Sequence, residues 1–145
     1  MNRTESQLTG AIYGLLKDSP LASMVSGEVY HAGMRPRDRK AEDIIVAYIS
    51  ATPAHNPISY INDQQNAVIT VNIYVPDIDP WENGVLVEDK ARCAVLEQAA
   101  AEWVESLEGL TEYRIRLYDT IHTTEVTGTE QHSVVVSLRV DYCDT

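Results

Sequence analysis

Residues 83–109 have the apolar spacing of one long helix. Apolar side chains recur there at steps of three and four residues, at Cys93, Leu96, Ala100, Trp103 and Leu107. This spacing places them on one helix face. We expect Asn83 to be the N-cap of this helix and Gly109 to end it. Such a helix needs an apolar surface to cover, and alternating, strand-like segments precede and follow it.

The N-terminal half predicts two short helical segments and then three strands. Thr4 and Gln7 form a capping-box pair ahead of a first helix of about three turns. Ser19-Pro20 ends this helix and starts a second, shorter turn. The strand candidates that follow are residues 28–32, 44–50 and 67–75.

The C-terminal half predicts a hairpin. Residues 113–124 and 133–142 both alternate, and a Thr127-Gly128 turn joins them. In this pairing Asp141 lies opposite Arg114 or Arg116. The chain therefore predicts one α+β domain over residues 1–145. It has a mainly antiparallel sheet of roughly four to five strands, in the order α-β-β-β-α-β-β, with both helices on one face.

The predicted sheet face that the helices leave open has a mixed composition. It combines Thr, Tyr, Arg and Ser side chains with Val135. A face that is neither fully polar nor fully apolar suits a surface between subunits.

The charge is strongly acidic and the basic residues are unevenly placed. The formal net charge is −11, which argues against ordinary nucleic-acid binding, since that needs a basic footprint. Four cations crowd into one short segment: Arg35, Arg37, Arg39 and Lys40. Such a segment is either a solvated loop or a contact for an acidic partner surface. The long polar connection of residues 52–66 is a second candidate binding element.

The four histidines do not predict a metal site. They are His31, His55, His122 and His132, and none has a metal-ligand spacing with a cysteine or a carboxylate. Asp77, Asp79 and Glu88 begin to match a calcium-loop template. The template fails because Trp81 takes a ligand position and Glu82 replaces the required glycine. We instead expect a polar loop there that Trp81 anchors.

Catalytic signatures are missing from the sequence as well. It contains no glycine-rich phosphate loop and no GxSxG nucleophile elbow. Cys93 lies in the middle of an apolar helix face, where a thiolate is disfavoured. We therefore expect no catalytic residue, no metal and no cofactor. This favours an assembly or binding role over an enzyme.

The order of elements, together with several short stretches, resembles the tail terminator, or tail-completion, family of long-tailed phages and prophages. That family includes minor tail and head–tail joining proteins. The stretches that carry the resemblance are LASMV at 21–25, GEVY at 27–30, YIS at 48–50, AVITVNIY at 67–74, the Ala-rich helix at 88–107 and SVVVSLRVDY at 133–142.

The resemblance implies a virion protein of the tail or neck, present in the host cytoplasm during assembly and not bound to a membrane. It implies a homo-oligomeric ring, commonly a hexamer, that caps the tail tube, stops its polymerisation and contacts a neck or connector protein. DNA would pass through the ring without specific binding. As subunit or partner contacts we expect Arg35, Arg37, Arg39, Lys40, Arg114 and Arg116. The alternatives are a head–tail connector or minor capsid component of similar topology, or a small α+β ligand-binding domain.

Overall fold

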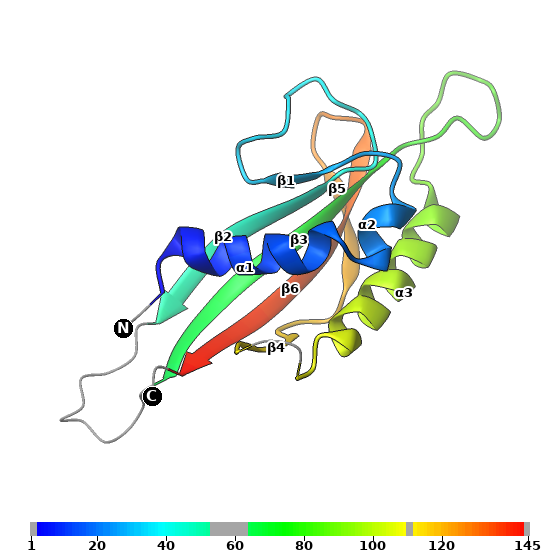
Figure 1. Ribbon diagram of the computed structural model, residues 1–145. Helices are drawn as coiled ribbons and strands as arrows, with labels where there is room; N and C mark the ends of the chain where they lie inside the picture. The colour runs from blue at the N-terminus through cyan, green and yellow to red at the C-terminus, as the bar shows by residue number, and fades with distance from the viewer. Residues whose placement is uncertain (1–2, 53–63, 110–111, 144–145) are drawn as a thin grey trace.

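The computed structural model describes residues 3–52, 64–109 and 112–143 (Figure 1). Within these residues three helices lie on one face of a six-stranded mixed sheet. The elements are α1 (Glu5–Lys17), α2 (Pro20–Met24), β1 (Val29–His31), β2 (Ile44–Thr52), β3 (Gln64–Pro76), α3 (Lys90–Ser106), β4 (Arg114–Leu117), β5 (His122–Val126) and β6 (Gln131–Cys143). The predicted α+β class is confirmed. None of the helices within these residues is long and apolar enough to cross a membrane.

The sheet is built on one long antiparallel pair. Strands β3 and β6 pair along their whole length, from Gln64 opposite Cys143 to Pro76 opposite Gln131. The strand order is β1-β2-β3-β6-β4, and β5 also pairs with β6. Only the β1–β2 pair among the described strands is parallel. The long loop expected at residues 52–66 falls mostly on residues 53–63, which lie outside the described residues.

The predicted C-terminal hairpin differs from the structure in one respect. Residues 113–124 form two strands instead of one, and β4 and β5 occupy successive parts of the same β6 edge. The break has a local cause, because Asp119 accepts a hydrogen bond from the Thr120 N–H at 2.8 Å, and such side-chain bonds compete with a strand ladder. Asp141 was expected opposite Arg114 or Arg116, and Arg114 is the residue that lies directly opposite it.

The predicted N-cap is confirmed for α1 and wrong for α3. The capping box of α1 is present, with the Gln7 N–H 3.3 Å from Thr4 Oγ1 and the Thr4 N–H 2.9 Å from Gln7 Oε1. The expectation that Asn83 caps the long helix is wrong: α3 begins at Lys90 and Asp89 is its N-cap. The Asn83 side chain instead accepts from the Val85 N–H, inside a segment that folds back on itself before α3.

The core lies between the helices and one sheet face. Alternate residues of β3 and β6 are fully buried there. The apolar face of α3 contacts these two strands, and that of α1 contacts the neighbouring strands β1 and β2. The residues concerned are Ile69, Val71, Ile73, Val134, Val136, Leu138, Leu8, Ile12, Leu16, Leu96, Ala100 and Trp103.

The opposite sheet face has no helix over it within the described residues (Figure 1). We call this the uncovered sheet face. Its side chains are half-buried by one another, and they include Val68, Thr70, Asn72, Tyr74, Val135, Ser137 and Arg139. This mixed composition is the one that the sequence predicts.

Candidate functional site

The segment of residues 33–43, here called the basic loop, folds around a buried carboxylate. Asp43 is fully buried, and its Oδ2 accepts hydrogen bonds from Arg35 Nε at 2.8 Å and Arg39 Nε at 2.7 Å. Its Oδ1 accepts from the Glu28 N–H at 2.9 Å. Arg35 also donates to Gln131 Oε1 at 2.8 Å. Two of the four cations in the basic loop are therefore internal structural groups.

The charge state of Asp43 follows from two opposing effects. Burial would raise the pKa of its carboxyl, because water no longer solvates the anion. The hydrogen bonds from Arg39, the Glu28 N–H and Arg35 outweigh burial and hold the pKa below its ordinary value. Asp43 is thus an anion at neutral pH, with its charge matched by the two guanidinium groups.

The outer surface of the basic loop carries Arg37, Lys40 and the exposed acid Asp38. Glu42 is paired with Arg92 of α3, with Arg92 Nε 2.7 Å from Glu42 Oε2. Lys40 Nζ lies 2.9 Å from Glu130 Oε2 in an exposed pair. Arg37 is exposed and, within the described residues, its side chain makes no hydrogen bond or ion pair. Among the expected contact residues of this loop, Arg37 and Lys40 are the ones available to a partner.

The two hairpin arginines lie at the other end of the molecule, on the edge strand β4. Arg116 Nη2 lies 3.3 Å from Asp141 Oδ2, and Arg139 Nε lies 3.1 Å from the second oxygen of the same buried carboxylate. Arg114 is exposed and its side chain has no ion pair in the described part of the chain. The structure thus separates Arg114 and Arg116 from the basic loop.

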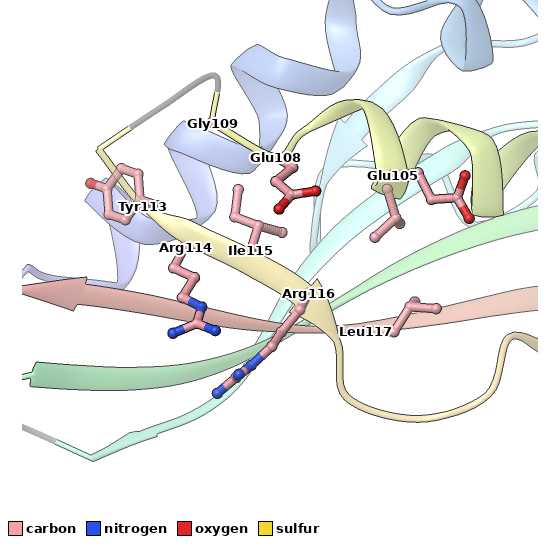
Figure 2. A pocket seen from close by; sticks show the side chains of 9 residues that line it. Glu105, Glu108, Gly109, Tyr113, Arg114, Ile115, Arg116 and Leu117 are labelled. Carbon is pink, nitrogen blue, oxygen red and sulfur yellow. The ribbon is translucent and has the colours of Figure 1, made fainter.

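A hollow of about 380 Å³ lies between β4 and the C-terminal end of α3. Figure 2 shows Ile115 directed toward α3, while Arg114 and Arg116 point the opposite way. Glu105 and Glu108 line the helix side of the hollow. Its lining is therefore apolar at the base and carries charges of both signs at the rim.

Residues 77–89, here called the arm, project from the body between β3 and α3 (Figure 1). Ile78 and Val87 exchange two backbone hydrogen bonds, of 2.9 and 2.8 Å. The Asp79 carboxylate accepts from the Asn83 and Gly84 N–H groups at 3.1 and 2.9 Å. The tip of the arm is therefore held by its own backbone.

The expectation that Trp81 anchors this segment is wrong, because its side chain is 67% exposed. Asp79 holds the turn through backbone N–H groups, so no indole contact is needed. Val85 and Leu86 on the same arm are also exposed, at 54% and 41%. The sequence contained one signal for this surface: three consecutive apolar residues, 85–87, stand between a turn-rich segment and the helix.

The histidines and Cys93 have structural surroundings. His31 stacks on Tyr13 with ring centroids 4.2 Å apart, and His132 Nδ1 lies 2.6 Å from Asp77 Oδ1 at the base of the arm. His55 lies outside the described residues. Within residues 3–52, 64–109 and 112–143, no group of three His, Cys, Asp or Glu side chains could hold a metal ion. Burial raises the pKa of the Cys93 thiol to about 11, and Glu88 nearby adds to the shift.

Comparisons with known proteins give one structural neighbour to describe. No family model matches the chain, and no curated protein matches it. Among solved structures, one chain whose name carries no functional information is similar in fold. It is 19% identical, the TM-score is 0.49, and the match covers 98% of this chain and 99% of that chain.

Proposed function

We propose that this chain is a structural subunit of a phage tail, a tail terminator or tail-completion protein that assembles into a ring. The observation that carries the proposal is the uncovered sheet face, on which Thr70, Asn72, Val135 and Ser137 lie beside one another in paired strands. These side chains are short polar or β-branched, and no helix covers them within the described residues, so a neighbouring subunit can cover this face. The resemblance of the element order to tail terminators supports the same conclusion.

The acidic balance of the chain suits a ring around DNA. With a formal net charge of −11, a channel lined by these subunits repels the phosphate backbone, so DNA slides without sticking. The exposed cations of the basic loop are then left for protein contacts. Arg37 and Lys40 have the exposure that such contacts need.

The experiment that tests the proposal is negative-stain electron microscopy of the purified protein, combined with sedimentation velocity over a wide range of concentrations. We expect closed rings with a central opening. A chain that stays monomeric at the highest concentration reached would contradict the proposal.

A second measurement places the ring in the virion. A terminator added to the tail tube protein shortens the tubes that form, because it caps their growing ends. A ring that leaves tube length unchanged, and that co-purifies with a portal or capsid protein instead, would favour the head–tail connector over the terminator.

A further inference from the structure

We infer that the arm of one subunit docks on the basic loop of the next subunit, with Trp81 and Glu82 contacting the surface around Met34 and Arg37. The inference rests on the proposed ring, and it names the two surfaces that hold neighbouring copies together.

The arm has the properties of a preformed binding element. Its Trp81 side chain is 67% exposed, and Ile78 on the same arm is 38% exposed. Three contacts already order the arm: the Ile78–Val87 bridge, the Asp79 turn, and the His132–Asp77 contact at its base. Few of its residues therefore have to be ordered on docking. Docking therefore loses little conformational entropy, and a large aromatic side chain is the commonest anchor of a protein interface.

The charges of the two surfaces are complementary. The arm holds five acidic residues and no Lys or Arg: Asp77, Asp79, Glu82, Glu88 and Asp89. The basic loop concentrates four of the eleven Lys and Arg residues of the chain. Of its three acids, Glu42 and Asp43 are paired with arginines and Asp38 is exposed, so the loop keeps a small excess of positive charge, which Arg37 presents without an ion pair among the described residues. In a chain of net charge −11, an acidic arm finds few other attractive surfaces on a copy of itself.

The basic loop also offers an apolar contact for the indole. Met34 is 69% exposed and lies beside a hollow of about 590 Å³ that His31, Ala32 and Tyr48 help to line. A thioether packs well against an aromatic ring, and the guanidinium of Arg37 is free to lie over the indole face. The basic loop thus offers Trp81 and Glu82 an apolar group and a cation three residues apart in the sequence.

The inferred contact joins different copies. The basic loop and the base of the arm both contact the start of β6, but in Figure 1 the arm then projects away from the body on the α3 side, away from the basic loop. Two different surfaces that fit each other make a head-to-tail interface, which closes into a ring when the rotation between subunits allows it.

The first test compares two variants by sedimentation velocity. Trp81→Ala removes the arm anchor, and Val95→Ala is the matched control, since Val95 is 47% exposed on α3. We expect Trp81→Ala to raise the dissociation constant at least about tenfold, as loss of an aromatic anchor does, and Val95→Ala to leave it unchanged. A Trp81→Ala protein that assembles like the wild type would overturn the inference and leave the ring proposal intact. A wild type that never assembles would instead contradict the ring proposal.

The second test uses complementation. Arg37→Glu removes the receiving surface, with Lys17→Glu as its matched charge control on α1. Trp81→Ala and Arg37→Glu each lack one half of the interface, so each alone is expected to be monomeric. When the two variants are mixed, the intact arm of the Arg37→Glu protein can bind the intact basic loop of the Trp81→Ala protein. The other arm and the other loop are defective, so we expect a one-to-one dimer that cannot grow. A mixture that stays monomeric, or one that regains full rings, would overturn the head-to-tail pairing.

Discussion

Arg35 donates a hydrogen bond from Nε to Oδ2 of Asp43 over 2.8 Å, and this ion pair ties the basic loop to the start of β2. The Arg35 side chain is only 10% exposed and the Asp43 side chain is fully buried. Arg35 also lies over the ring of Tyr74, 4.4 Å from its centroid. Because water is largely excluded, removal of Asp43 would leave Arg35 without a counter-charge, and removal of Arg35 would leave Asp43 with Arg39 alone.

Replacement of Asp43 by alanine is therefore expected to destabilise the monomer strongly. The change leaves Arg35 without its anion and Glu28 N–H without its acceptor, and breaking a buried pair costs about 3 kcal/mol or more. Urea unfolding of the monomer measures the loss. Asp38→Ala is the control, since Asp38 is exposed in the same loop and a surface change costs about 0.5 kcal/mol or less. Equal stabilities of the two variants would contradict the structural role of Asp43.

The same carboxylate predicts how stability depends on pH. Its pKa in the folded protein is below its ordinary value, so the unfolded chain binds a proton at a higher pH than the folded one. The stabilisation is complete above the unfolded pKa of about 3.9 and is lost as the pH falls through the folded pKa. We expect the stability difference between the wild type and Asp43→Asn to be constant from about pH 7 to 5 and to shrink below about pH 4. A difference that grows on acidification would contradict this sign.

The sequence predicted the parts of the fold that depend on local periodicity. The body of α3, the buried face of β3 and the placement of Asp141 opposite Arg114 or Arg116 each follow from spacing within one or two segments. The predicted start of α3 was wrong because Asn83 and Asp89 are both acceptable N-caps. The backbone bridge between Ile78 and Val87 keeps residues up to Val87 out of the helix, so Asp89 is the N-cap. Periodicity contains no information about such a bridge.

The candidate site was harder to predict because its contacts are distant in sequence. The spacing of the four cations is the same for a solvated loop and for a buried cluster. Arg35 turns inward because of Asp43 and of Gln131, which is 96 residues away. One signal was present: Asp43 directly precedes a strongly apolar strand, and a carboxylate drawn into a core needs cations around it.

The basic loop can now be tested without unfolding the subunit. Arg37→Ala is expected to leave the free energy of unfolding within about 0.5 kcal/mol of the wild type, because its side chain is exposed. Arg35→Ala is expected to lower it by about 2 kcal/mol, because buried Asp43 then keeps only Arg39 of its two guanidinium partners and Gln131 loses its charged donor. Chemical unfolding of both variants checks the contrast, and ring assembly of Arg37→Ala then reports on the interface alone. Equal losses of stability in the two variants would contradict the assignment of a structural role to Arg35 and a surface role to Arg37.

The two tryptophans allow the arm to be observed directly during assembly. Trp81 is 67% exposed and Trp103 is 5% exposed, and the buried Trp103 Nε1 has no hydrogen-bond partner among the residues that the structure describes. Trp103→Phe therefore removes the indole donor, keeps an aromatic ring in the core and leaves Trp81 as the sole tryptophan. We expect acrylamide to quench Trp81 strongly in dilute monomer and weakly in assembled protein, because docking covers the indole. Trp81→Phe, which reports on Trp103 alone, should show weak quenching at every concentration. Equal quenching of Trp81 in monomer and ring would mean that the indole stays in water, and the arm would then have no part in holding subunits together.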